Sequence, residues 1–76
     1  MRVMVETYAG YGGVEMPRRF HFDGREIEVT ENIDRWPRPD YCCFQVKDSD
    51  GNTYILRHDQ RRAEWELTLF QSAKWV

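Results

Sequence analysis

Two adjacent cysteines and a histidine are the residues of this chain with the most reactive chemistry. The stretch DYCCFQVKDSDGNTYILRHD, residues 40–59, places Cys42 and Cys43 before an Asp-Gly pair and His58 after it. If the two flanking segments pair as strands, Cys43 lies opposite His58, and an imidazole can activate a neighbouring thiol. The sequence offers no recognisable oxyanion donor and no third residue to orient the imidazole. A thiol-dependent enzyme is therefore the least favoured hypothesis.

Metal binding by the same residues is not expected. Neighbouring side chains on a strand point to opposite faces, and a structural zinc site needs four ligands at loop spacings such as C-x₂-C. The segment that begins at Asp48 resembles the start of a calcium loop, but an EF-hand needs glycine at position 53 and glutamate at position 59. The chain has Thr53 and Asp59 there. We predict no metal ion and no cofactor, and we assign Cys42 to the core.

The elements that would position these residues are strands. The segment RRFHFDGREIEV, residues 18–29, alternates polar and apolar residues around an Asp-Gly pair. This pair favours a two-residue type I′ turn, which needs positive φ at both central positions. The resulting register gathers the apolar residues on one face and pairs opposite charges on the other. The predicted pairs are Phe22–Arg25, His21–Glu26, Phe20–Ile27 and Arg19–Glu28.

A second hairpin is predicted around Asp50 and Gly51, again with a two-residue turn. Residues 53–58 carry apolar side chains on both faces, which is typical of a central strand or of a strand in a curled sheet. The predicted pairs are Asp48–Thr53, Val46–Ile55, Phe44–Arg57 and Cys43–His58.

Three further segments complete the predicted sheet. RVMVETY, residues 2–8, reads as a first strand, and residues 9–17 form a flexible glycine-rich connection. EWELTLF, residues 64–70, is expected to return beside residues 53–58 with Trp65, Leu67 and Leu69 on one face. DRWPRPD, residues 34–40, is predicted as a loop because Pro37 and Pro39 lack N–H donors.

The predicted fold is all-β and forms a single domain over residues 1–76. About five or six antiparallel strands in sequential order would curl into a small SH3-like barrel or half-barrel. A net charge of −2 and a pI near 5.6 give no basic footprint for non-specific nucleic-acid binding. No stretch approaches the roughly 18 apolar residues of a membrane span, and no signal peptide is apparent. We expect a cytoplasmic protein.

Aromatic and arginine residues in or beside the loops are the remaining functional signal. Together they could bind a protein partner, since Tyr, Trp and Arg dominate interface energetics. They could equally bind a single-stranded nucleic acid by stacking and phosphate contacts. The structural alternative is that Trp36 caps the barrel and the arginines keep the protein soluble. The candidate binding residues are Tyr11, Arg35, Trp36, Arg38 and Tyr41.

A family resemblance extends from Gly24 to Phe70. Its elements are GREIEV, DRW, YCCFQV, an Asp-Gly turn, YILRHD and EWELTLF. Together they resemble a small uncharacterised bacterial domain, and similar segments lie at the C-terminus of some inactive Y-family polymerase homologues that act in mutasomes. The resemblance implies an all-β accessory domain without assigned catalytic residues. It makes residues 34–36 the first stretch to examine.

The sequence as a whole favours a non-enzymatic interaction module. The leading hypothesis is a protein partner held by the exposed aromatic and arginine residues. The alternative is a nucleic-acid-binding accessory domain associated with DNA repair.

Overall fold

The computed structural model describes residues 1–73, apart from the side chain of Tyr11. These residues form strands and one short 3₁₀ turn, which is the all-β architecture that the sequence predicts. The strands are β1 (Arg2–Ala9), β2 (Glu15–Phe22), β3 (Arg25–Glu28), β4 (Glu31–Pro37), β5 (Tyr41–Lys47), β6 (Thr53–Asp59) and β7 (Glu64–Gln71), and the turn η1 spans Tyr11–Gly13.

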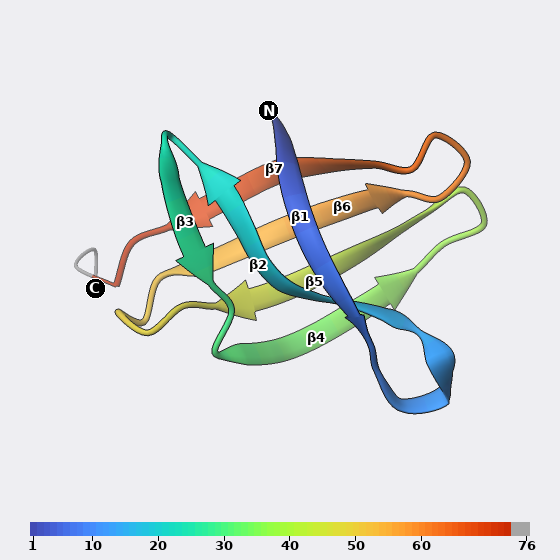
Figure 1. Ribbon diagram of the computed structural model, residues 1–76, viewed down its shortest axis with the longest axis horizontal. Coiled ribbons are helices and arrows are strands. Elements are labelled where there is room, and N and C mark those ends of the chain that lie inside the picture. The colour runs from blue at the N-terminus through green and yellow to red at the C-terminus, as the bar shows by residue number, and fades with distance from the viewer. Residues whose placement is uncertain (74–76) are drawn as a thin grey trace.

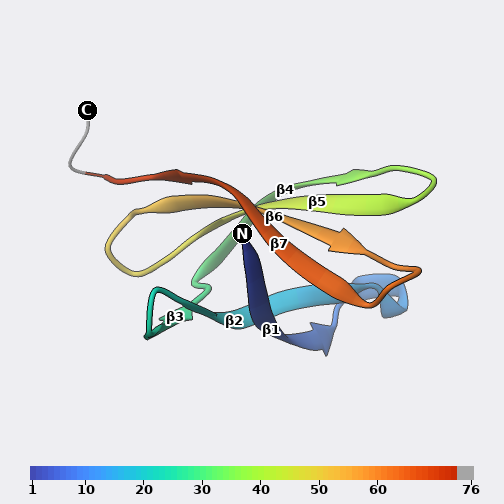
Figure 2. The same ribbon diagram turned by 90° about the horizontal axis from the view of Figure 1, so that it is seen from above.

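All seven strands belong to one antiparallel sheet with the order β3-β2-β1-β7-β6-β5-β4. The sheet curls over itself, so that β1, β2 and β3 form one layer and cross the layer of β4 to β7 (Figures 1 and 2). The predicted half-barrel is therefore confirmed. The strand number of five or six and the sequential order are wrong, because β4 is an additional strand and β1 pairs with β7. A sheet of this size also does not fit the SH3-like description.

The additional strand β4 occupies most of the segment that was predicted to be a loop. It pairs with β5 from Glu31 to Pro37 and forms one edge of the sheet. An edge strand needs hydrogen-bond donors on one side only, so a proline at its end is tolerated. The glycine-rich connection is shorter than predicted, since β1 runs to Ala9 and β2 begins at Glu15.

The first hairpin forms as the sequence predicts. Asp23 and Gly24 have φ angles of 54° and 73°, which are the two positive values that a type I′ turn requires. All four predicted pairs are present, from Phe22 with Arg25 at the turn to Arg19 with Glu28. The charged pair also carries an ion pair, with Arg19 Nε 3.0 Å from Glu28 Oε1.

The second hairpin is shifted by one residue from its predicted register. The Gly51 N–H donates to the Asp48 carbonyl at 3.1 Å, and the Asp48 N–H donates to the Asn52 carbonyl at 3.0 Å. These two bonds enclose a three-residue loop that ends on Gly51 at φ 84°, a known alternative to the two-residue turn. Cys43 consequently lies opposite Arg57 and not opposite His58, which pairs with Cys42.

The Asp48 carboxylate holds this longer loop in place. Its Oδ1 accepts the N–H groups of Asp50 and Asn52, each at 2.9 Å, and its Oδ2 accepts the Tyr54 hydroxyl at 2.7 Å. Burial raises the pKa of Asp48, but the hydrogen bonds from Tyr54, Asn52 and Asp50 outweigh it and leave the pKa below its usual value. Burial and the neighbouring carboxylate raise the pKa of Tyr54 far above its usual value. This buried network sets the register of the β5–β6 hairpin, which the alternation of polar and apolar residues alone does not determine.

A bulge changes the face of β7 halfway along its length. Leu67 pairs with Leu56 and Leu69 pairs with Ile55, so Thr68 has no residue opposite it. The extra residue reverses the alternation beyond it. Leu69 is 49% exposed and does not share the inner face with Trp65 and Leu67, contrary to the prediction. Phe70 takes that face, with its ring centroid 5.2 Å from that of Tyr54.

The core lies between the two layers and draws on both. Phe20 of β2 meets Tyr54 of β6 edge to face, with ring centroids 5.0 Å apart, a favourable aromatic geometry. Cys42 is only 3% exposed, which confirms its assignment to the core. Among the described residues, no helix is long and apolar enough to cross a membrane. The buried apolar residues are Val3, Phe20, Cys42, Phe44, Val46, Tyr54, Leu56, Trp65 and Leu67.

Candidate binding surfaces

A row of side chains crosses the outer face of the β4–β7 layer, the face turned away from the core. In an antiparallel sheet, directly paired residues point to the same side. One residue of each strand from β4 to β1 is paired directly with the next. On β5, the alternate residues Cys42, Phe44 and Val46 point into the core, so this row points outward. The row consists of Trp36, Cys43, Arg57, Glu66 and Arg2.

Tyr41 and Arg38 lie beside this row at the end of the β4–β5 hairpin. The Arg57 guanidinium lies over the Tyr41 ring, 5.5 Å from its centroid, and it also pairs with Glu66. Arg38 follows β4, and its N–H donates to the Tyr41 carbonyl at 2.8 Å. We call Trp36, Arg38, Tyr41 and Arg57 the aromatic–arginine surface.

The structure brings together three of the five candidate binding residues. Trp36, Arg38 and Tyr41 meet at the outer face, where Trp36 and Tyr41 are half-buried and Arg38 is exposed. Arg35 pairs with Phe44 and points to the inner face, where it lines a cavity with Cys42, Phe44 and His58. The Tyr11 side chain lies outside the described part of the structure. The split between Arg35 and Trp36 follows directly from β4 being a strand.

The proposed thiol–imidazole pair does not form. Cys43 lies on the outer face opposite Arg57, whereas His58 is buried on the inner face. Burial and the neighbouring thiol of Cys42 raise the pKa of Cys43, and they outweigh the lowering by Arg57 and Arg38. A nucleophilic cysteine needs a depressed pKa to supply thiolate. Because the surroundings of Cys43 raise its pKa, they do not favour a nucleophilic thiolate.

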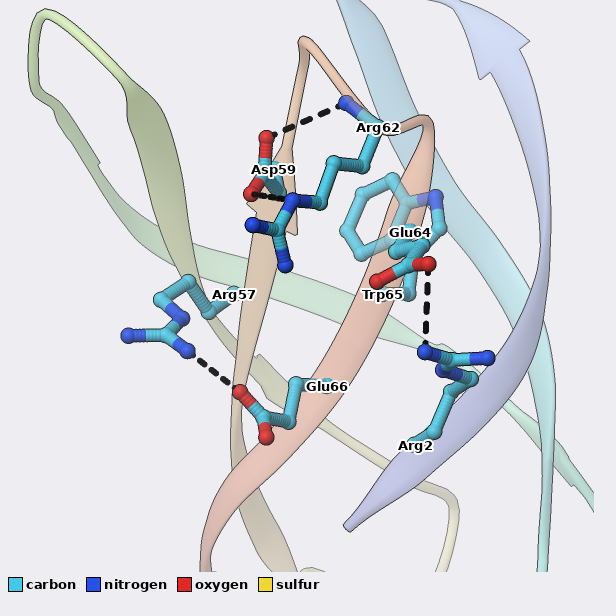
Figure 3. A pocket seen from close by; sticks show the side chains of 7 residues that line it. All are labelled: Arg2, Arg57, Asp59, Arg62, Glu64, Trp65 and Glu66. Atoms are coloured by element: carbon cyan, nitrogen blue, oxygen red, sulfur yellow. Dashed lines mark hydrogen bonds and ion pairs between the residues drawn. The ribbon is translucent and has the colours of Figure 1, made fainter.

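Arginines on the rest of this face are matched by carboxylates. A cavity of about 230 Å³ lies where β6 ends and β7 begins, and Figure 3 shows the side chains that line it. Arg2 lies 3.1 Å from Glu64, and Arg57 pairs with Glu66. Arg62 lies 4.0 Å from Asp59. Within the residues that line this cavity, each arginine therefore has an acidic partner that would compete with a bound anion.

Among residues 1–73, one cluster of potential metal ligands is found, on the outer face of the β1–β3 layer. Glu6, His21 and Glu26 place one ligand atom each within 4.8 Å of one another. The His21–Glu26 pair was predicted from the hairpin, but the approach of Glu6 depends on the β1–β2 pairing. All three side chains are exposed, and Glu6 also meets Arg19 at 3.5 Å. This arrangement fits a solvated charge network, so we assign no ion to it.

Comparisons with known proteins identify no relative. No family model, no curated protein and no solved structure matches this chain. Function must therefore be inferred from the residues that the fold places together.

Proposed function

We propose that this protein is a non-enzymatic interaction module that binds a protein partner through the aromatic–arginine surface. The observation that supports this most directly is the position of Arg57 over the Tyr41 ring, in the same cross-strand row as Trp36. Trp, Tyr and Arg are the residues that most often carry the binding energy of protein interfaces. Here three residues of the surface, Trp36, Tyr41 and Arg57, are carried by paired strands, which fixes the positions of their backbones relative to one another.

The charge of the surface favours a protein over a nucleic acid. A nucleic-acid site needs arginines and lysines that can neutralise phosphates. Arg57 already pairs with Glu66, and the neighbouring Arg2 and Arg62 pair with Glu64 and Asp59. An aromatic centre surrounded by polar and charged residues matches the core and the rim of a protein interface.

A second candidate function is nucleic-acid binding in a repair-associated accessory domain. Arg38 is exposed and forms no ion pair with any described residue, and it lies beside Tyr41. An unpaired arginine next to an aromatic ring is the arrangement used to bind single strands. If the chain belongs with the domains that it resembles, either kind of partner would come from a DNA repair complex.

The proposal is tested by partner capture with folded variants. Trp36→Ala and Tyr41→Ala should each lose a partner that the wild-type protein retains, since truncating an aromatic hot spot of an interface weakens binding by about 2 kcal/mol or more. The matched control is Met4→Ala, because Met4 is 76% exposed on the β1–β3 layer. Retention of every captured protein by Trp36→Ala and Tyr41→Ala would disprove the proposed surface.

Salt dependence separates the two candidate functions. Tryptophan fluorescence should show no response to a single-stranded oligonucleotide if the partner is a protein. A quenching that weakens steeply between low and moderate salt, and that Arg38→Gln reduces, would establish the nucleic-acid function instead.

A further inference from the structure

A groove follows the mouth of the half-barrel, on the face opposite the aromatic–arginine surface. It consists of two adjoining cavities of about 400 and 450 Å³. One opens beside β4 and β5 and the other beside β1 and β7. Cavities of this size are those that hold small organic molecules. Both cavities are lined by Glu15, His58 and Ala63.

His58 is a polar residue with little solvent exposure, and it lines both cavities. It is 8% exposed, and its ring stacks on Trp65 with centroids 4.2 Å apart and planes 5° from parallel. Its ring nitrogens form no hydrogen bond with any residue between 1 and 73. Neither ring nitrogen is among the fully enclosed polar atoms that lack a partner, so the imidazole keeps access to solvent. Since His58 lines both cavities, a hydrogen-bond partner can reach it from the groove.

Arg35 provides a positive charge at the same place. It pairs with Phe44 and lines the first cavity with His58, and it is exposed with no ion pair among the described residues. A guanidinium group binds a carboxylate through two parallel hydrogen bonds. The floor between Arg35 and His58 is apolar and consists of Cys42 and Phe44.

We propose that this groove binds a small organic acid with an apolar body. Its carboxylate accepts hydrogen bonds from Arg35 and His58, and its body packs on Cys42 and Phe44. The second cavity continues the apolar wall through Val3, Val5 and Trp65, so longer chains or rings extend in that direction. Glu15 lies at the junction of the cavities, and its exposed carboxylate repels the bound anion.

The probe pair is 3-phenylpropionate and 3-phenylpropylamine, which share a body and differ in the sign of the charged group. Each is titrated into the full chain while amide and imidazole NMR signals are recorded. The acid should produce saturable shifts at Phe44 and His58 with a dissociation constant of about 1 mM, a normal value for so small a ligand. The amine should bind at least about tenfold more weakly.

Four variants locate the site. Arg35→Gln should weaken the acid by roughly tenfold, as expected for losing a charge-assisted hydrogen bond. His58→Phe keeps an aromatic ring against Trp65 and should weaken the acid by a few fold. Glu15→Gln should strengthen it, because a like charge is removed. Arg25→Gln is the matched control, since Arg25 is an exposed arginine outside both cavities.

Three results would overturn the proposal: no saturation by the acid up to about 10 mM, tighter binding of the amine than the acid, or weaker binding of the acid to Glu15→Gln. Exposed positions 35 and 15 can be changed without disturbing the core, so a folding defect in His58→Phe would leave the test intact. The groove and the aromatic–arginine surface lie on opposite faces, and either proposal can fail alone.

Discussion

Two of the hairpins in this protein contain an Asp-Gly pair at the turn and fold it differently. In the β2–β3 hairpin, Asp23 and Gly24 both have positive φ and form a two-residue turn. In the β5–β6 hairpin, Gly51 alone has positive φ and closes a three-residue loop. The difference arises from Asp48, whose carboxylate accepts hydrogen bonds from within that loop. A buried side chain outside the turn pair can therefore decide the register of a hairpin.

Of the substitutions that test this difference between the hairpins, Asp48→Asn should destabilise the protein most. The amide replaces one acceptor of the buried network with a donor, so we expect a loss of about 2 kcal/mol in the free energy of unfolding. Asp23→Asn is the matched control and should change that free energy by less than about 0.5 kcal/mol, since asparagine tolerates positive φ. Urea unfolding measures both. Equal effects of the two substitutions would contradict the role assigned to Asp48.

Tyr54→Phe tests the same network from its donor side. The Tyr54 hydroxyl is a buried donor to Asp48 at 2.7 Å, and its removal should cost about 1.5 kcal/mol. Tyr8→Phe is the comparison, because the Tyr8 hydroxyl accepts only a long, exposed bond of 3.5 Å from Asn32. A change below about 0.5 kcal/mol is expected there. Urea unfolding of the two variants side by side would refute the argument if Tyr8→Phe proved the more damaging.

The glycines should respond alike in both hairpins. Gly24 and Gly51 have φ angles of 73° and 84°, and alanine is strained in that region by about 1 kcal/mol. The Cβ of alanine at position 24 meets no atom within 4 Å, and at position 51 it lies 3.4 Å from Ala73. That distance is an ordinary van der Waals contact, so thermal unfolding of Gly24→Ala and Gly51→Ala should show similar losses. If alanine were destabilising at only one of the two positions, the prediction that both turns need a glycine for its positive φ would be wrong.

The smallest expected effect is the pH dependence of the stability that Asp48 gives to the β5–β6 hairpin. Hydrogen bonding holds the pKa of Asp48 below its usual value in the folded state, so the unfolded chain binds the proton more readily. The contribution of Asp48 is then complete above the ordinary aspartate pKa of about 4 and falls as the pH drops through the folded value. The stability gap between wild type and Asp48→Asn should narrow from pH 6 towards pH 3. A constant gap would show that Asp48 has an ordinary pKa.

The sequence predicts the pairs that alternation and a turn signal encode, and it misses those that depend on a buried side chain, a bulge or a distant strand. The β2–β3 register follows from alternation and a turn signal, and every pair is confirmed. The pairing of β1 with β7 joins residues far apart in the chain. The bulge at Thr68 lies between neighbouring strands, but alternation alone does not encode it. Trp36, Arg38 and Tyr41 were predicted as candidates, but Arg57 was not, and the position of Arg35 on the other face was not foreseen. Placing Arg35 and Trp36 on opposite faces required recognising β4 as a strand, which Pro37 and the following Pro39 concealed.

The pairing of β1 with β7 has a consequence for how the chain reaches this state. Val3 pairs with Trp65, and the Met1 carbonyl accepts the Leu67 N–H. On the ribosome, the first strand is made long before its β7 partner emerges, so until then it has only β2 beside it. Contacts of such long sequence separation slow folding and leave apolar strands uncovered in the interval. A chaperone that shields β1 during synthesis would act at the step where this sheet is most open to aggregation.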